Sequence, residues 1–548
     1  MVLTKLEKYA LIIIPLLFLF YSAPSALDYI FFHADEKRYT DAVIHMMDKD
    51  ECFTPFKADG ETPRFKKPII TYWALMGGFK LFGVSPFGAR FFFWIAGALL
   101  VALTYLMSNS LFQNKKISVL AAFIVAANPL VMMSASRSIP DILLVLFLTT
   151  SAWGFLEIMI REKTPKKFYW MAYLGAALAF ETKGIPAAAF AVASILFLLL
   201  NPWKRVQLKK LIAPAAIPVS VVIALSWYIL MVVQHGNTFV DTFFADQVGD
   251  RVSSKLTQIL TNGILGILNL FLFFIPWVIL FLSKPGQLKK EIVKSKTNVK
   301  AILGFVASWV VLIVLMSASV FKFYDRYILP CIPLVALVLA YSIVNFNTAF
   351  RKPVFKVFAG INLAVLLIAL LYLLFISQNA VLILGVVAGL VLNILYFLGI
   401  FRKISKEILI ANALMLIYFT GHILLYPLLM PVPAKQLVVS FKEHLEHEKD
   451  PVYVYGHIGI PANVRVQGHA ELNIISMDTV YVLPETPNHI IAFKEKEKQR
   501  LNLENYDIYP GSEEWSDVPA GKFPPFLRKP VENLKNRGTK YFIGKPKQ

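Results

Sequence analysis

The segment FFHADEKRYTDAVIHMM (residues 31–47) directly follows the first long apolar run of the chain and carries seven titratable side chains. Residues 36–49 have helical periodicity, with Tyr39 on the apolar face, so a helix is predicted there, and Asp35 stands at its start. An acid at that place can simply cap the helix and interact with the positive end of its dipole. A carboxylate can also accept a proton or orient a nucleophilic hydroxyl, which is the functional alternative for Asp35.

Five further polar stretches interrupt the apolar sequence and bring together bases, acids or tyrosines. Each has a simple structural explanation: lysines that snorkel to a lipid surface, acids in the first turn of a helix, an ion-paired turn, a solvated loop, or a belt of aromatic and basic residues. They contain Lys66, Lys67 and Tyr72 in TPRFKKPIITYW; Asp141 in SRSIPDILL; Glu181 and Lys183 in AFETKGIPAAA; Asp241, Asp246, Asp250 and Arg251 in DTFFADQVGDRVSS; and Lys322, Tyr324, Arg326 and Tyr327 in SVFKFYDRYILP.

The combination of these side chains suits one kind of chemistry better than each alone. Lysine, arginine and tyrosine bind phosphate or pyrophosphate through charge-assisted hydrogen bonds. A carboxylate placed opposite them can orient or deprotonate an acceptor. Transfer of a group from a lipid-linked phosphate donor needs both functions, and a lipid donor would reach the site through the membrane.

The elements that must position these residues are membrane-spanning helices. Of the 548 residues, 57% are hydrophobic and only 16% are charged, whereas about a quarter are charged in a typical soluble protein. The apolar residues come in runs of roughly 18–25, the length needed to cross a bilayer. The predicted spans, thirteen in number, are 9–27, 86–107, 117–136, 139–159, 168–182, 185–201, 211–233, 258–282, 301–320, 327–346, 354–376, 380–400 and 407–429.

The distribution of lysine and arginine predicts the orientation. Alternate loops are rich in these residues, and the positive-inside rule assigns such loops to the cytoplasm. The net charge of +20 is therefore explained by topology, and no nucleic-acid partner is expected. We expect a bacterial inner-membrane protein with a cytoplasmic N-terminus, no cleavable signal peptide, and all of the polar stretches above on the periplasmic face.

The chain after residue 430 has the composition of a soluble domain. PVYVYGHI and TKYFIGKP are predicted strands, AKQLVVSFKEHLEHEKD is predicted to be an amphipathic helix, and HIIAFKEKEKQRL is predicted to be a strand followed by a helix. We therefore expect a transmembrane domain at 1–430, with a first periplasmic loop at 28–85, and a small α/β periplasmic domain at 431–548.

The order of these motifs resembles the protein-mannosyltransferase-like glycosyltransferases of the GT-C fold. The first loop, ADEKRYTDAV through DECFTPFKADGE and TPRFKKPIITYW to KLFGVSPFGARFF, is similar in order and spacing to the family pattern D-E-x-x-Y, then G-D-W-x-x-P, then F-x-K-P-P-L-x-Y-W, then K-L-F-G-x-x. The later stretches resemble the later family blocks in the right order. With a soluble C-terminal domain, the chain looks like the aminoarabinose transferase branch, which modifies lipid A.

This resemblance implies a GT-C fold, a polyprenyl-phosphate-sugar donor and a periplasmic active site. It assigns catalytic positions to Asp35, Lys67 and Asp141. It assigns substrate binding to a second group of residues, in which Lys183, Arg251 and either Tyr324 or Lys322 would hold the donor phosphate. This second group is Tyr39, Tyr72, Lys183, Arg251, Lys322 and Tyr324.

Two positions depart from the pattern of the aminoarabinose branch. Position 66 is Lys where that branch usually has Glu, and the usual His before Arg251 is missing, with Asp246 near its place. In that branch the Glu and His together can hold a metal ion. We therefore expect no metal site and no other cofactor here, and a Lys66–Asp246 ion pair instead. The departures also leave room for a different sugar or acceptor.

Three functions follow from the residues and the resemblance. The first is a membrane glycosyltransferase that moves a sugar from a polyprenyl (undecaprenyl) phosphate to lipid A or lipopolysaccharide, with inversion at the anomeric carbon and with membrane lipids around it. The second is the same donor chemistry on a protein or other glycan hydroxyl, for which Asp35 would serve as base. The third, a lipid or solute transporter, predicts charges near the middle of the membrane, whereas here they gather at one face.

Overall fold

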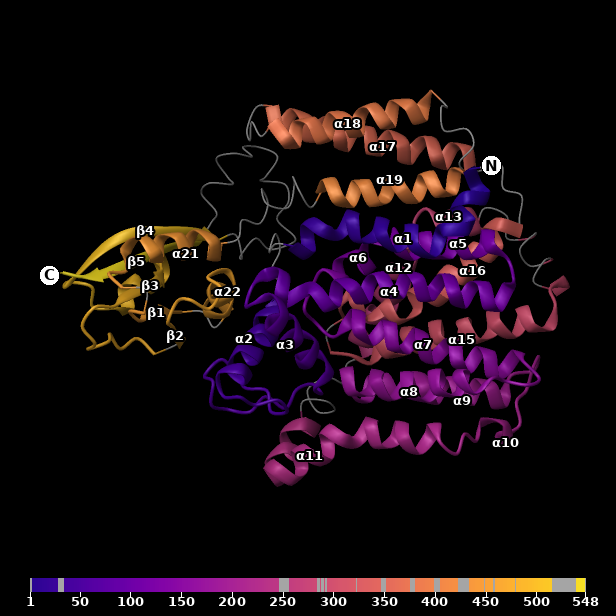
Figure 1. The fold of residues 1–548 in the computed structure, drawn as a ribbon, viewed down its shortest axis with the longest axis horizontal. Helices are drawn as coiled ribbons and strands as arrows, with labels where there is room; N and C mark the ends of the chain where they lie inside the picture. The colour runs from indigo at the N-terminus through magenta and orange to yellow at the C-terminus, as the bar shows by residue number, and fades with distance from the viewer. Residues whose placement is uncertain are drawn as a thin grey trace.

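The structure is a computed structural model in which a helical bundle is joined to a small sheet domain (Figure 1). It describes residues 2–27, 34–245, 256–282, 286, 290, 293–321, 323–345, 351–374, 380–398, 405–421, 433–447, 449–456, 459–478, 480–514 and 539–547. Most bundle helices run along one common direction, and the sheet domain lies at the same end of the bundle as helices α2 (Ala34–Asp48) and α3 (Ile70–Phe82).

The remaining bundle helices follow the order of the predicted spans, and each predicted span overlaps at least one of them. They are α1 (Val2–Leu27), α4 (Pro86–Phe112), α5 (Lys115–Ala126), α6 (Pro129–Ala135), α7 (Asp141–Ile160), α8 (Lys166–Lys183), α9 (Ile185–Leu200), α10 (Leu208–Leu211), α11 (Ala216–Phe244), α12 (Leu256–Leu272), α13 (Trp277–Leu282), α15 (Thr297–Ser319), the 3-10 helix η2 (Asp325–Cys331), α16 (Ile332–Asn345), α17 (Arg351–Tyr372), α18 (Ala380–Phe397) and α19 (Lys406–Thr420).

The protein is a multi-pass membrane protein. Within the described residues, seven helical segments are long and apolar enough to cross a bilayer, or eight if the bent pair α5 and α6 forms one span. α11 exposes Val222, Ile229 and Val233, as expected of a helix surface that contacts lipid tails. Thirteen spans therefore remain a prediction.

The breaks between helices follow from local sequence. α5 and α6 meet at an angle of 62° because Asn128 caps α6 through its side chain and Pro129 occupies the first helical position. α8 and α9 are separated by Gly184, whose φ of 76° lies in the left-handed region that glycine adopts most readily. The chain therefore reverses directly after Lys183.

Close packing of α7 on α8 brings two predicted site residues together. A Cβ atom on Gly154 would lie 2.3 Å from the backbone nitrogen of Ala172, and one on Gly175 would lie 2.8 Å from that of Ser151. Small residues at such points let helix backbones approach closely in membranes. The N-terminus of α7 lies beside the C-terminus of α8, so Asp141 and Lys183 meet at one end of the pair.

A buried ion pair fixes the start of α2 on the bundle. Arg90 of α4 donates from Nε to Oε1 of Glu36 (2.9 Å) and from Nη2 to Oε2 (2.8 Å), and the Ser138 backbone N–H donates to Oε1 (2.8 Å). Arg90 also donates to the backbone carbonyl of Ser25 at the end of α1. Both charged side chains are buried, so this pair joins α1, α2, α4 and the connection before α7.

The C-terminal domain has a core of its own and the predicted α/β character. Strand β1 (Val452–Tyr455) corresponds to PVYVYGHI, β5 (Thr539–Pro546) to TKYFIGKP, and α21 (Pro433–His444) to the predicted amphipathic helix. The sheet order is β2-β1-β3-β5-β4; β1 is parallel to β2 and β3, and β5 is antiparallel to β3 and β4. The other elements are α22 (Gly459–Gln467), β2 (Ile474–Asp478), β3 (Ile490–Lys494), the 3-10 helix η5 (Glu495–Arg500) and β4 (Tyr506–Glu514).

We predict that Glu36→Gln destabilises the protein by about 3–5 kcal/mol, because Arg90 would keep its charge in a buried place without a counter-charge. Thermal unfolding of the purified protein in detergent measures the effect as a lower midpoint. Lys442→Met, which removes an exposed ion pair with Glu471, is the control and should not move the midpoint. Equal midpoints for both variants would show that the buried pair does not stabilise the fold.

Candidate functional site

Four elements bring charged side chains together at the end of the bundle that carries α2. Asp35 lies in the first turn of α2, Asp141 in the first turn of α7, Lys183 in the last turn of α8, and Arg326 in η2. The four residues come from parts of the sequence up to 291 positions apart. The structure therefore places three of the predicted site residues in one cluster and adds Arg326 to them.

Arg326 connects the two carboxylates. Its Nη2 donates to Oδ2 of Asp35 at 2.7 Å, and its Nε lies 3.6 Å from Oδ2 of Asp141. Asp35 is thus a helical residue in an ion pair, and its carboxylate does more than satisfy the helix start. The guanidinium carbon of Arg326 lies 4.8 Å from the centre of the Tyr324 ring, which is a cation–π distance.

Lys183 supplies the second cation of the cluster. Its Nζ lies 2.5 Å from Oδ1 of Asp141 and 5.6 Å from the centre of the Tyr327 ring. The predicted ion-paired turn in AFETKGIPAAA is therefore not formed by Glu181 with Lys183, since Lys183 pairs with α7 and Glu181 accepts a bond from the backbone N–H of Trp227. Arg38, one turn along α2, also lies 3.8 Å from Oδ1 of Asp35, so each carboxylate of the cluster meets more than one cation.

Two predicted tyrosines form a second group with an arginine. The rings of Tyr39 and Tyr72 are 5.2 Å apart, and Arg64 donates from Nε to the Tyr72 hydroxyl at 3.2 Å. Burial raises the pKa of Tyr39 well above its usual value, so its phenol stays protonated. Burial alone would lower the pKa of Arg64, but Tyr72, Tyr39 and Asp35 together raise it above its usual value, so the guanidinium stays charged.

Lys67 is buried in the connection before α3, with an exposed fraction of 8%. A lysine that snorkels to the lipid surface would extend its ammonium group into water, so the structure does not support that explanation for Lys67. Its neighbour Lys66 cannot be tested against the predicted Lys66–Asp246 ion pair, because Asp246 lies outside the described residues. Arg251 and Lys322 lie outside them as well.

Two arginines, Arg64 and Arg326, join the predicted site residues in the structure but are not among them. Arg326 stands two residues after Tyr324 in SVFKFYDRYILP, and Arg64 stands three residues before Lys67 in TPRFKKPIITYW. Each motif therefore contains an arginine close to a predicted site residue, and this proximity could have marked the arginine as a further candidate. An arginine that is ion-paired or hydrogen-bonded among tyrosines is a candidate for binding phosphate.

Comparison with known proteins agrees with this fold and these motifs. The model of the dolichyl-phosphate-mannose-protein mannosyltransferase family matches residues 66–229. An uncharacterized protein of Aquifex aeolicus (strain VF5) is 26% identical over 61% of this chain and 64% of its own length. The undecaprenyl phosphate-alpha-4-amino-4-deoxy-L-arabinose arabinosyl transferase of Yersinia pestis (strain Pestoides F) is 28% identical over 60% of this chain and 58% of its own. The matches thus span less than two thirds of these curated relatives.

Two solved structures have the same fold across nearly the whole chain. ArnT from Cupriavidus metallidurans bound to undecaprenyl phosphate has a TM-score of 0.68, and its apo state has 0.66; each is 14% identical and covers 99% of this chain and 97% of the other. The fold is therefore that of the GT-C glycosyltransferases. The arabinosyl transferases among its relatives and the match to the mannosyltransferase model agree with the resemblance seen in its motifs.

We predict that Asp141 and Lys183 are energetically coupled. Lys183→Met removes the cation that lies nearest to Asp141 among the described pairs. It should therefore destabilise the wild-type protein more than it destabilises the Asp141→Asn variant, in which no carboxylate is left to lose its partner. A double-mutant cycle by thermal unfolding in detergent should give a coupling of about 0.5–3 kcal/mol. If the two single losses simply add in the double variant, the ion pair contributes nothing to stability.

Proposed function

We propose that this protein is an integral membrane glycosyltransferase that moves a sugar from a polyprenyl phosphate to lipid A or another part of lipopolysaccharide. The observation that carries the proposal is the Arg326 bridge, which holds Asp35 and Asp141 together beside Lys183 at one end of the bundle. The arabinosyl transferases among its relatives and the fold shared with ArnT support this choice of reaction.

In the proposed reaction, the bond between the anomeric carbon and the phosphate oxygen breaks, and the polyprenyl phosphate leaves with the bonding electrons. An acceptor oxygen forms the new bond from the opposite side, so the configuration inverts. Lys183 and Arg326 neutralise the charge that grows on the leaving phosphate. An acceptor phosphate is already ionised and needs no base, whereas a hydroxyl acceptor would give its proton to Asp35.

The ion pairs of the cluster suggest how donor binding prepares the acceptor site. Arg326 and Lys183 are neutralised by Asp35 and Asp141 when no phosphate is bound. A donor phosphate would compete for both cations, because bidentate phosphate contacts are strong for arginine. When Arg326 turns toward the phosphate, it releases Oδ2 of Asp35. This oxygen can then orient the acceptor.

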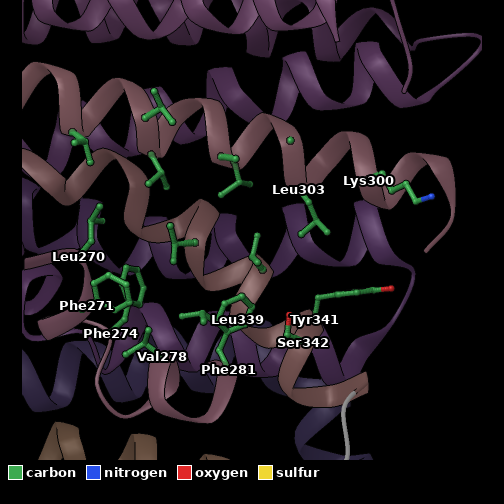
Figure 2. A pocket seen from close by; sticks show the side chains of 18 of the residues that line it. Leu270, Phe271, Phe274, Val278, Phe281, Lys300, Leu303, Leu339, Tyr341 and Ser342 are labelled. Atoms are coloured by element: carbon green, nitrogen blue, oxygen red, sulfur yellow. The ribbon is translucent and has the colours of Figure 1, made fainter. Parts of the chain in front are cut away.

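An apolar cavity between α12, α13, α15 and α16 suits the donor chain. Its volume is about 830 Å³, and aromatic and aliphatic side chains such as Phe271, Phe274 and Leu339 line it. Figure 2 shows its few polar side chains, Lys300 and Tyr341 among them, gathered at one end. That polar end is remote from η2, because Lys300 lies near the start of α15 and Tyr341 near the end of α16, whereas η2 lies between these two helices in the chain. α12, α15 and α16 contact η2, which carries Arg326, so a polyprenyl chain would enter the cavity from the end nearest a phosphate held at Arg326.

We further propose that this reaction takes place on the periplasmic face of the bacterial inner membrane. The loops rich in lysine and arginine then lie in the cytoplasm together with the N-terminus. The sheet domain lies at the end of the bundle that carries α2 (Figure 1), and Asp35 is in the first turn of α2. This agrees with a division into a transmembrane domain, 1–430, and a periplasmic domain, 431–548.

We predict that Asp35→Asn and Lys67→Ala each lower sugar transfer by at least about 100-fold. Mass spectrometry of lipid A from cells with each variant measures the loss, and cells with and without the wild-type protein give the mass of the sugar. Asp48→Asn, an exposed acid at the other end of α2, is the matched control. Full transfer by folded Asp35→Asn and Lys67→Ala variants would refute these site assignments, and an unchanged lipid A with the wild type would refute this acceptor.

The cavity predicts a dependence on chain length. Ala307 lines the cavity on α15, so Ala307→Trp should fill part of it and raise the KM for an undecaprenyl-phosphate sugar about 10-fold, equivalent to about 1.4 kcal/mol. The KM for a short-chain prenyl-phosphate sugar should change little. Leu315→Trp, on an exposed position of the same helix, is the control. An equal effect of Ala307→Trp on both donors would place the chain elsewhere.

A further inference from the structure

The C-terminal domain contacts the helix that carries Asp35. Its helix α22 packs on α2, and Arg465 of α22 forms an ion pair with Asp41 of α2 through Nη1. The other terminal nitrogen of Arg465, Nη2, donates to the backbone carbonyl of Ile474 at 2.8 Å. The guanidinium is thus held by β2 of its own domain, while its Nη1 faces α2, where it contacts Asp41 and lies 3.4 Å from Nε2 of His45.

The ion pair between Asp41 and Arg465 is largely buried, so its loss would be costly for the contact between α2 and α22. The side chain of Asp41 is only 5% exposed and that of Arg465 only 12%. Burial raises the pKa of the Asp41 carboxyl, and the neighbouring Arg465 and His45 oppose that shift. His45 lies one turn further along α2, with Nε2 3.9 Å from Oδ1 of Asp41. A buried carboxylate without its partner is strongly destabilising, so the two elements are held together by more than a surface contact.

The position of Asp41 on α2 determines what the contact can control. Asp41 stands six positions after Asp35, which corresponds to about 9 Å along a helix and about 120° around it. Asp35 faces Arg326 of the bundle, and Asp41 faces Arg465 of the C-terminal domain. Glu36 fixes the start of α2, while Arg465 holds it more than one turn further on, so the two contacts together resist both tilt and rotation.

We propose that Arg465 is a positioning residue, through which the C-terminal domain holds α2 so that Asp35 stays aligned with Arg326. Arg465 itself does not touch the reacting atoms. The kinetic part of this proposal rests on the proposed glycosyl transfer, whereas the mechanical part concerns only the mobility of α2. The domain is then a structural part of the active site and not an independent module attached to it.

The decisive variant is Asp41→Asn combined with Arg465→Met, because it removes the link without leaving a buried charge. We expect kcat for sugar transfer in proteoliposomes to fall about 10-fold with an unchanged KM for the donor. Arg465→Lys should keep part of the activity, since lysine can pair with Asp41 but cannot also reach the Ile474 carbonyl in the same fork geometry. Lys442→Met, which breaks an exposed pair inside the same domain, should behave as wild type.

Hydrogen exchange provides the readout that does not depend on activity. In the double variant, amides of α2 should exchange faster than in wild type, whereas amides in the sheet of the C-terminal domain should keep their protection. Wild-type kcat together with unchanged exchange of α2 in the folded double variant would overturn the proposal. If the wild-type protein transfers no sugar, the proposed function fails, and the exchange of α2 then decides the mechanical link alone.

Discussion

The buried pair of Glu36 and Arg90 is the constraint on which the site depends. Four hydrogen bonds reach the Glu36 carboxylate, from two nitrogens of Arg90 and from the backbone and hydroxyl of Ser138. Removing two charges from water is costly, and the cost is recovered only if the geometry is good and every polar atom finds a partner. The pair also fixes residues near it in the chain, because Asp35 is next to Glu36 and Asp141 stands three positions after Ser138. One buried pair therefore sets the positions of both carboxylates.

The second feature of the site is the pairing of its opposite charges. Lys183 and Arg326 face Asp35 and Asp141 within hydrogen-bonding or ion-pair distance. In a partly buried environment such interactions are stronger than in water, so the cluster is held in place before any ligand is present. A ligand phosphate would not enter an empty positive pocket; it would exchange with carboxylates that already occupy the cations. Binding of the negative group and release of the acids are then a single event.

Much of the fold could be predicted because it depends on local patterns. Apolar runs of membrane length indicated the helices, periodicity indicated α2, and alternating strand patterns indicated the sheet of the C-terminal domain. The pairing of Arg326 with Asp35 could not be predicted in the same way, because 291 residues separate them and their contact depends on how η2 packs between α7, α12, α15 and α16. Asp141 and Lys183 are 42 residues apart, and their contact requires the glycine-mediated approach of α7 and α8, which a single sequence does not indicate.

Local sequence patterns also fail to indicate the roles of two charged residues on α2. Glu36 and Asp41 sit on one short helix among several other charges, and nothing in their spacing separates them from solvated neighbours. Their surroundings in the structure distinguish these two residues from their neighbours. Glu36 is buried against the helical bundle and pairs with Arg90, whereas Asp41 is buried against the C-terminal domain and pairs with Arg465. A helix held from different directions by two buried ion pairs has little freedom to turn, and Asp35, which is next to Glu36, is held rigidly as a result. Preorganisation of this kind is what a transfer reaction needs, because a group that is already aligned spends no free energy on reorganisation when the charge moves.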